Sequence, residues 1–159
     1  MASALDRVAL SELRIRRAEP ADHARVMAVL DEWWGGRRMR DMLPRLFFVH
    51  FRETSFVAER DGDLVGFLVG FLSAAEPEEA YVHFVGVSPA ERGGGLGREL
   101  YERFFALARA DGRARVRCVT SPANGDSLAF HTALGFESSP PQRAYDGPGE
   151  DRVVLTRSL

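Results

Sequence analysis

Residues 81–105 read YVHFVGVSPAERGGGLGRELYERFF, and this stretch combines three patterns in a fixed order. An apolar run rich in valine and aromatic residues comes first and predicts a β-strand over residues 80–87. Three consecutive glycines follow, with a fourth one residue later. Apolar residues at helical spacing then predict a helix from about residue 96 to about residue 110. A strand, a glycine-rich turn and a helix in this order gather backbone N–H groups at the positive end of a helix, which indicates an anion site.

Several kinds of glycine-rich turn can be compared with this one. A Walker A loop ends in Gly-Lys-Ser/Thr, whereas Arg98 and Glu99 follow Gly97 here. A dinucleotide-binding fingerprint needs a further glycine at position 98 or 100, where the chain has arginine and leucine. A flexible surface turn is the remaining alternative, and the entropy that glycines lose on folding disfavours it. The pattern that fits is Arg/Gln-x-x-Gly-x-Gly/Ala, matched by Arg92, Gly95 and Gly97.

A second motif, SPANGDSLAFHTALGF, covers residues 121–136. It predicts a helix with Asp126 as the N-cap and Gly135 at the C-terminal cap. With both motifs in this order and at this separation, the chain resembles the Gcn5-related N-acetyltransferase (GNAT) superfamily. The resemblance runs from the first predicted strand, at Leu13, to Leu159 at the end of the last one.

The rest of the chain alternates strands and helices, which predicts an α/β (α+β) fold. Strands are expected over residues 13–18, 115–121 and 152–159, and a helix over residues 19–34. Residues 55–72 read as a hairpin that turns at Asp61-Gly62. The resemblance implies the GNAT acyl-CoA N-acyltransferase fold, with a mixed central sheet of about six to seven strands, splayed between strands 4 and 5, and helices on both faces. We expect one domain over residues 1–159, with residues 1–11 as a loose N-terminal leader.

Composition narrows the function classes. The chain has 159 residues, a formal net charge of −2 and 21 basic residues, all arginine, so no global basic field favours nucleic acid or an anionic membrane. No apolar run approaches the roughly 20 residues of a membrane helix. The single cysteine, Cys118, excludes an internal disulfide and predicts a cytoplasmic setting. The four histidines have no metal-ligand spacing, so we expect no metal.

The resemblance implies acetyl-CoA, or coenzyme A after transfer, as the bound acetyl donor. In the family the pantetheine arm pairs with the strand that matches residues 80–87, and the diphosphate lies over the amides of the glycine-rich turn. An asparagine that contacts the pantetheine in relatives is matched by Asn124. The expected donor-binding residues are Val85, Gly86, Val87, Arg92, Gly93, Gly94, Gly95, Leu96, Gly97, Arg98, Asn124, Ser127, Phe130 and His131.

The resemblance also implies direct attack of an amine on the thioester. The Val87 N–H is expected to stabilise the oxyanion that forms. His131 stands where many relatives have a tyrosine that protonates the leaving thiolate, and an imidazolium can do the same; the alternative is a histidine that only packs. Ser127 lies four residues earlier on the same helix face. His83 shares a strand face with Val87 and is a candidate base, against the alternatives of a buried histidine or a base acting through a water chain.

Acceptor recognition is assigned to three segments by the resemblance: the first helix, the segment after it, and the loop before the last strand. Trp33, Trp34 and Arg37 are the candidates near the helix end, and Tyr81 and Tyr145 are the others. Arginine suits a substrate carboxylate, and tryptophan suits an apolar or cationic group. The alternatives are that the tryptophans complete the core stripe of the helix and that the arginines are solvated.

The resulting prediction is an acetyl-CoA-dependent N-acetyltransferase that acts on a primary amine of a small molecule, such as an amino acid, a polyamine or an antibiotic-like compound. Two alternatives stay open: an acetyltransferase of protein N-termini or lysines, and a non-catalytic acyl-CoA-binding module. Dimers are frequent among relatives, and the resemblance therefore points to a homodimer.

Overall fold

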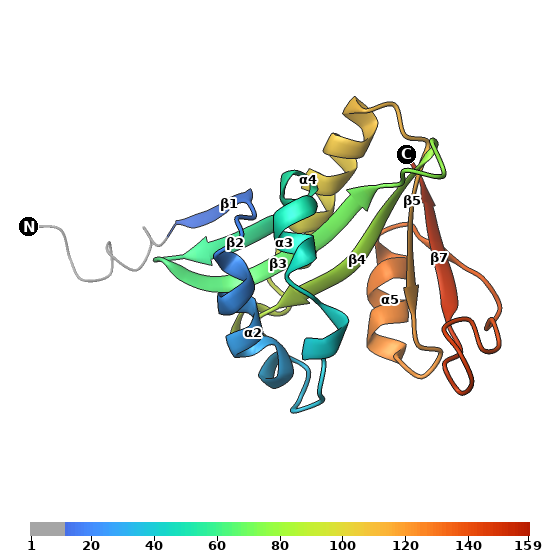
Figure 1. The fold of residues 1–159 in the computed structure, drawn as a ribbon, viewed down its shortest axis with the longest axis horizontal. Helices are drawn as coiled ribbons and strands as arrows, with labels where there is room; N and C mark the ends of the chain where they lie inside the picture. Colours follow the sequence, from blue (N-terminus) through green and yellow to red (C-terminus); the bar gives the residue numbers. More distant parts are fainter. Residues whose placement is uncertain (1–11) are drawn as a thin grey trace, which may run out of the picture. The chain divides into compact units, whose positions relative to one another are not determined.

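The computed structural model describes residues 12–159, so the leader expected over residues 1–11 lies outside the described residues. The chain divides into two compact units. The first comprises residues 12–69 and Phe84–Tyr101, and the second comprises Gly70–His83 and Glu102–Leu159. Figure 1 follows the elements along the chain by colour. The expectation of a single domain stays a prediction.

The secondary structure follows the alternation expected from the sequence. With η denoting short 3-10 helices, the elements are β1 (Leu13–Arg17), α2 (Asp22–Trp33), η1 (Arg40–Met42), α3 (Leu46–His50), η2 (Arg52–Thr54), β2 (Phe56–Arg60), β3 (Asp63–Leu72), β4 (Glu79–Val87), η3 (Pro89–Glu91), α4 (Leu96–Ala110), β5 (Arg115–Thr120), α5 (Gly125–Ala133), β6 (Glu137–Ser138) and β7 (Val153–Ser158). The strands form a seven-stranded sheet in the order β1-β2-β3-β4-β5-β7-β6. β4 and β5 are parallel, whereas β1 with β2 and β5 with β7 are antiparallel. The predicted mixed α/β fold is therefore confirmed.

The hairpin turn between β2 and β3 lies where the sequence placed it. Asp61 and Gly62 both have positive φ, 53° and 82°, the backbone that a two-residue turn between antiparallel strands prefers. The two strands pair from Phe56 with Leu68 to Arg60 with Asp63, with one register shift at Ala58/Glu59.

The core of the first unit forms where α2 packs against β3. Trp33 of α2 stacks on Phe67 of β3, with ring centroids 6.1 Å apart. At the next residue, Gly66, an added Cβ would meet Leu96 of α4 at 3.0 Å. Neighbouring residues of a strand point to opposite faces, so α2 and α4 cover opposite faces of β3, as predicted. The buried stripe of α2 consists of Val26, Leu30 and Trp33.

Gly86 in β4 has a packing reason. A Cβ at this position would lie 2.6 Å from the ring of Phe67 and 2.9 Å from the ring of Trp34. Trp34 also packs edge-on against Phe84, with centroids 5.0 Å apart. The close approach of these two aromatic rings to the strand is therefore what requires a glycine here.

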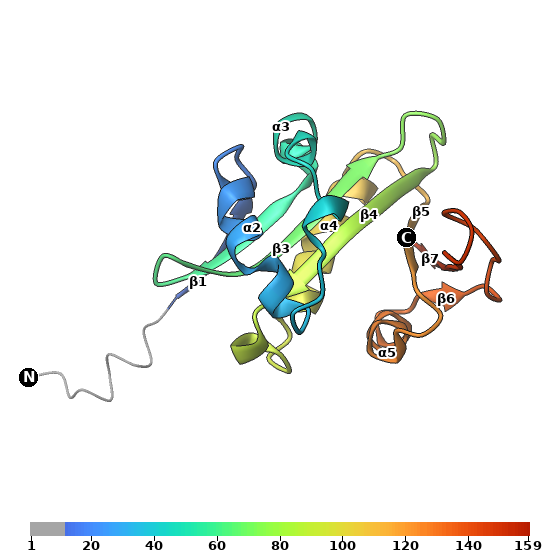
Figure 2. The ribbon, with the colours of Figure 1, turned by 60° about the horizontal axis from the view of Figure 1, so that its bottom comes forward.

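In the second unit, β5 pairs with both β4 and β7. Its parallel register with β4 covers residues 79–81 and 115–117, the first three of each strand, as expected for strands that splay apart. Its antiparallel register with β7 covers residues 115–120. Figure 2 shows α5 beside β6 in this unit. Asn124 caps α5 by accepting the Ser127 amide, so the expectation of Asp126 as N-cap was wrong: the helix begins before it, at Gly125.

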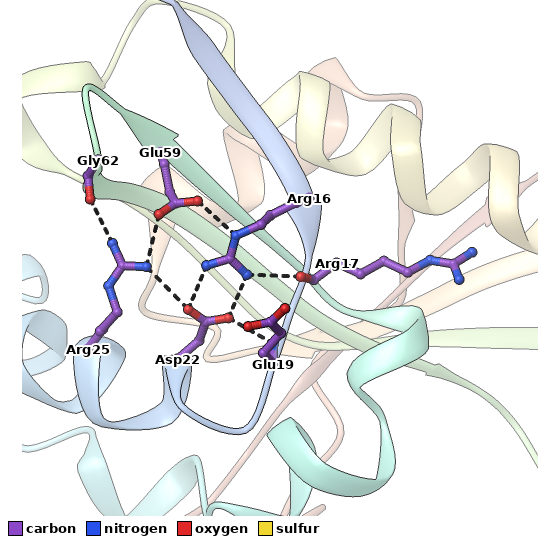
Figure 3. A network of polar contacts seen from close by, with 7 residues as sticks. All are labelled: Arg16, Arg17, Glu19, Asp22, Arg25, Glu59 and Gly62. Carbon is purple, nitrogen blue, oxygen red and sulfur yellow. Dashed lines mark hydrogen bonds and ion pairs between the residues drawn. The ribbon is translucent and has the colours of Figure 1, made fainter.

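A buried carboxylate joins β1, α2 and β2 in the first unit (Figure 3). Arg16 donates to both oxygens of Asp22, at 2.8 and 2.9 Å, and to Glu59 at 2.8 Å. Arg25 contacts the same two acids at 3.2 and 3.1 Å. Burial alone raises the pKa of Asp22, but the hydrogen bonds from Arg16 and from the Glu19 amide outweigh it and hold this pKa below its ordinary value. Asp22 is therefore charged at neutral pH and fixes the first turn of α2 to the sheet.

Replacing Asp22 tests this network. We expect Asp22→Asn to lower the free energy of unfolding at pH 7 by about 2–4 kcal/mol, because Arg16 and Arg25 keep their charge while the neutral amide offers one acceptor oxygen instead of two and no negative charge. Urea denaturation measures the loss. Asp41→Asn is the matched control, because Asp41 forms a highly exposed ion pair with Arg38 at 3.1 Å. Its effect should stay within about 0.5 kcal/mol.

The pH dependence of the same pair of proteins is a second measurement. The stabilisation from Asp22 is present above its ordinary pKa and is lost as the pH falls through the lowered pKa of the folded state. The gap between wild type and Asp22→Asn should therefore close in acid. An equal stability at pH 7 would contradict the role given to Asp22.

Candidate functional site

The glycine-rich turn between β4 and α4 exposes its backbone. Gly93 and Gly95 have φ of 84° and 85°, in the left-handed region, and Gly94 between them does not. A Cβ added at Gly93 or Gly95 would meet nothing within 4 Å, so glycine is needed there for conformation and not for space. Within residues 12–159, the amides of Gly93 and Gly95 donate to no protein acceptor. Alternating conformations of this kind form a concavity of N–H groups that suits an anion.

The turn is fixed at its start by a side chain from the hairpin. Arg60, the last residue of β2, donates to the two oxygens of Glu91 at 2.8 and 3.2 Å. The hydrogen bond from Arg60 lowers the pKa of Glu91. Glu91 is the last residue of η3 and stands two residues before Gly93. This forked contact therefore sets where the glycines begin.

The turn is fixed at its end by α4. Leu96, Gly97 and Leu100 are buried, and Arg98 is exposed. The Glu99 amide donates to the Gly95 carbonyl at 3.0 Å, which closes the first helical bond directly after the turn. The exposed glycines thus lie between two ordered segments, with the positive end of a 15-residue helix next to them.

The candidate donor strand, the C-terminal part of β4, leads into the same turn. Val85 and Val87 are half-buried, and Gly86 between them is covered by aromatic rings. The Ser88 amide donates to the Val65 carbonyl at 2.9 Å. The Val87 carbonyl accepts the Arg92 Nε at 3.3 Å.

Arg92 and the end of α2 were assigned different roles by the sequence, and the structure brings them together. The Arg92 Nη2 donates to the Trp33 carbonyl at 2.5 Å. Trp33 is only 6% exposed, so its ring belongs to the core and not to an acceptor site. Trp34 is half-buried and Arg37 is exposed. The acceptor hypothesis near this helix end therefore rests on Trp34 and Arg37.

In the second unit, three of the predicted residues are linked by contacts along α5, from its N-cap to its last turn. The Asn124 Oδ1 accepts the Ser127 amide at 3.1 Å, so this oxygen is used for capping and the side-chain NH₂ is the group suited to a ligand. The Ser127 hydroxyl lies 3.3 Å from His131 Nδ1. The sequence prediction that these two side chains share a helix face is confirmed.

His131 is a buried, neutral imidazole. Its Nδ1 lies 2.7 Å from the Ser127 carbonyl, which only accepts, so Nδ1 carries the proton. The ring is 5% exposed and packs edge-on against Phe130 and Phe136, with centroids 5.2 Å away in both cases. Burial lowers the pKa of His131, although the hydrogen bond to the Ser127 carbonyl raises it in part. Phe130, beside this ring, is half-buried. An imidazolium at position 131 that donates a proton, as the sequence suggested, is therefore disfavoured at neutral pH.

Tyr81 and His83 lie on the part of β4 that belongs to the second unit, and both are half-buried. Tyr81 stacks on Phe71, with centroids 5.3 Å apart. Burial, together with the charges of Tyr145 and other neighbours, raises the pKa of Tyr81, so its phenol stays protonated. His83 has further contacts of its own, and its role as a base stays a prediction.

The loop before β7 neutralises most of its own acids. Arg152 pairs with Asp146 at 2.9 Å and with Glu150 at 2.8 Å. Asp151 accepts the Ala144 amide at 2.8 Å. Tyr145, at 47% exposure, is the candidate that stays accessible in this loop. Because these carboxylates already bind groups of their own loop, their positions are explained better by the structure of the turn than by recognition of an amine.

The candidate residues thus form two sets, each inside one unit. The first set contains residues 33–37, 85–87 and 92–98, and the second contains Tyr81, His83, residues 124–131 and Tyr145. Sequence reasoning missed Arg60 and Glu91, because a contact across 31 residues has no local signal. Among the described residues no cluster of three or more His, Cys, Asp or Glu has a geometry for a metal ion. None of the helices in this part of the chain has the length and apolar content to span a bilayer.

Comparison with known proteins finds a family whose sequence model matches most of the chain. A family model described as the acetyltransferase (GNAT) family matches residues 12–136. A curated relative, L-2,4-diaminobutyric acid acetyltransferase from Nocardia farcinica, is 37% identical over 84 residues, which cover 53% of this chain and 44% of the relative. The chain spans less than half the length of the first curated relatives that it matches.

Solved structures share the fold over nearly the whole chain. A diaminobutyrate acetyltransferase from Paenibacillus lautus, in complex with L-2,4-diaminobutyric acid and coenzyme A, has a TM-score of 0.72 at 24% identity and covers 93% of this chain and 95% of its own. The ribosomal-protein-S18-alanine N-acetyltransferase from Escherichia coli has a TM-score of 0.69 at 19% identity, with 93% and 94% covered.

The state of His131 gives a prediction for stability against pH. The folded state resists protonation of this ring, whereas the unfolded chain takes up a proton near the ordinary histidine pKa of about 6.5. Wild type should therefore lose stability as the pH falls below about 6.5, and His131→Phe should lose less over the same range. Denaturation in urea at a series of pH values gives both slopes. His50→Gln, at an exposed position, should keep the wild-type slope, and an equal slope for His131→Phe would refute the buried neutral state.

Proposed function

Because this chain belongs to the GNAT family of acetyltransferases, we propose that it transfers an acetyl group from acetyl-CoA to a primary amine of a small molecule. The observation that carries the proposal is the exposed turn at residues 93–95, in which Gly93 and Gly95 are left-handed and their amides donate to no acceptor within residues 12–159. The turn lies inside the segment matched by the family, directly before a long helix. A diphosphate is the anion that suits such a concavity at a helix N-terminus.

The donor is proposed to follow the last residues of β4 into this turn. The backbone of Val85 and Val87 would pair with the pantetheine arm. Within residues 92–98, the amides that donate to no protein carbonyl in the described part of the chain, those of Gly93 and Gly95 among them, would hold the diphosphate. The Val87 N–H would then stabilise the oxyanion of the attacked thioester, an effect worth about 3–4 kcal/mol where such donors have been removed. The donor needs no side-chain cation in this scheme, because backbone amides carry the contact.

The chemistry proposed is direct attack of the amine nitrogen on the thioester carbonyl. An N–C bond forms, the C–S bond breaks, the amine loses one proton, and the thiolate leaves and takes one up. Charge state limits which groups move these protons. Tyr81, whose pKa is raised, is a neutral phenol, and His131 is a neutral ring at pH 7, so neither supplies a charged acid. His83 and water are the candidates retained for taking the amine proton.

A small-molecule acceptor is proposed over a protein acceptor for two reasons. The relative named above and a solved neighbour are both diaminobutyrate acetyltransferases, by name enzymes of a small diamino acid. In this chain, exposed Arg37 beside half-buried Trp34 suits a carboxylate next to a short apolar part, as in an amino acid. A homodimer and a cytoplasmic setting belong to the same proposal. The neighbour that acts on a ribosomal protein keeps protein N-termini as the alternative.

An assay of thiol release tests the activity. The protein is incubated with acetyl-CoA and single amines, namely L-2,4-diaminobutyrate, other diamino acids, polyamines and a peptide with a free alanine N-terminus, and free coenzyme A is measured. We expect release with at least one small amine and none with the peptide. The chain contains no lysine, so it has no lysine amine that would be acetylated in place of the acceptor. Release with the peptide alone would favour the protein-directed alternative, and binding of acetyl-CoA without release would favour a binding module.

A substitution in the turn tests the donor site separately from the acceptor. Gly95→Ala forces a side chain into the left-handed region at φ 85°, and we expect it to lower coenzyme A affinity by about tenfold or more, with a stability loss of about 1 kcal/mol. Gly112→Ala is the control, because Gly112 at the other end of α4 has φ of 77° and equally open surroundings. It should lose similar stability and keep its affinity in isothermal titration calorimetry. Equal affinities for the two variants would remove the turn from the donor site.

A further inference from the structure

The C-terminal end of α2 has an unusual way of satisfying its carbonyls. The last carbonyls of a helix have no partner inside the helix and need one elsewhere. Here the Gly36 amide donates to Asp31 at 2.8 Å and the Gly35 amide to Glu32 at 3.0 Å, a Schellman arrangement with Gly35 at φ 69°. The Trp34 amide donates to Leu30 and Asp31, at 3.2 Å each.

The remaining carbonyl, that of Trp33, is taken by Arg92. α2 has no basic residue in its own last turn, so this guanidinium from another segment also supplies the positive charge that a helix C-terminus favours. The same guanidinium donates through Nε to the Val87 carbonyl. One side chain thus holds the end of α2 and the end of β4 together, and its own backbone begins the glycine turn.

We propose that Arg92 is a positioning residue that couples the donor-binding turn to the C-terminal end of α2 through these two carbonyls, and that its side chain is not a phosphate ligand. The inference rests on the proposed function, because it concerns the same turn. It refines the sequence prediction, in which Arg92 belonged to the donor-binding set: its amide donates to the Pro89 carbonyl at 3.4 Å, and its guanidinium acts on α2 and β4.

The coupling follows from where the glycines lie. Gly93, Gly94 and Gly95 come directly after Arg92, and glycine loses more conformational entropy on ordering than any other residue. With Arg92 anchored, the turn is ordered before a ligand arrives, and the ligand does not bear the cost of ordering it. Trp34, whose ring covers Gly86, and Arg37 follow the anchored carbonyl in sequence.

Coupling of this kind is reciprocal. A donor held on the turn should restrain Arg92 and so protect the last turn of α2 from opening. Loosening that last turn should weaken donor binding in return. The acceptor candidates Trp34 and Arg37 would therefore be better ordered when the donor is bound, with no change of fold.

Calorimetry with coenzyme A distinguishes an Arg92 side chain that binds protein carbonyls from one that binds the phosphates of the ligand. Arg92→Met should weaken binding about tenfold, and by the same factor at 50 and 500 mM NaCl, because the lost bonds go to protein carbonyls. A loss that shrinks strongly at high salt would show a direct charge contact with the phosphates and would overturn the proposal. Arg103→Met, which changes an exposed arginine of α4, should leave the affinity unchanged.

Hydrogen exchange measures the effect of bound coenzyme A on the C-terminal end of α2. In wild type, coenzyme A should slow amide exchange in residues 31–37 by about fivefold, and in Arg92→Met by less than about twofold at saturating ligand. Equal protection in both proteins would overturn the inference, because α2 would then respond without Arg92.

A double-mutant cycle covers the case in which Arg92→Met folds poorly. Gly35→Ala strains the Schellman turn at φ 69°, where the added Cβ meets no atom. It should weaken coenzyme A binding about threefold in wild type and by less in an Arg92→Lys background. Lysine at position 92 keeps the charge but loses the simultaneous contact with the Val87 and Trp33 carbonyls. Additive effects would exclude coupling. A wild-type protein that binds no coenzyme A would refute the proposed function itself, whereas normal binding with additive effects refutes only the role of Arg92.

Discussion

The left-handed backbone at Gly93 and Gly95 is the constraint on which the candidate site depends. Residues with a Cβ adopt this region at a cost of about 1–2 kcal/mol, so only glycine places these amides outward without strain. Such a turn is unstable by itself, because it contributes no side chain to a core. The neighbouring structure supplies what it lacks: a buried Leu96 on one side, and the Arg60–Glu91 contact on the other. The anion site is therefore a property of the anchored turn and not of the glycines alone.

Arginine side chains hold separate elements together in this protein, and the shape of the guanidinium explains why. A planar guanidinium donates in several fixed directions at once, whereas a lysine ammonium acts as a point charge. Arg92 uses this to reach two carbonyls on different elements. Arg157 does the same kind of work in the second unit, donating to the Leu134 carbonyl at 2.8 Å after the end of α5 while its guanidinium lies 4.3 Å from the centre of the Phe105 ring. A chain whose basic residues are all arginine thus uses them as structural donors within both units.

The sequence was sufficient for features that have a local cause. The turn at Asp61-Gly62, the start of α4 at Leu96 and the pairing of Ser127 with His131 all follow from residue type and spacing over a few positions. It was insufficient where two nearby residues could take the same local role, and where a long-range partner decides. Asp126 looked like an N-cap by type, yet Asn124 caps α5. Trp33 was a candidate for a ligand site, with the core as the alternative, and its low exposure and its stacking on Phe67 place the ring in the core.

His131 favours the opposite direction of proton transfer from the tyrosine that many relatives have at this position. A tyrosine there, as the resemblance implies for relatives, is a neutral donor. The Nδ1–H of His131 donates a hydrogen bond to the Ser127 carbonyl, and burial disfavours a second proton on the ring. The other ring nitrogen, Nε2, is then an acceptor by valence. If this residue takes part in the reaction, its ground state therefore favours receiving a proton over supplying one. The proton that the thiolate needs would in that case reach it from the attacking amine or from water, and the rate would fall as His131 becomes protonated in acid.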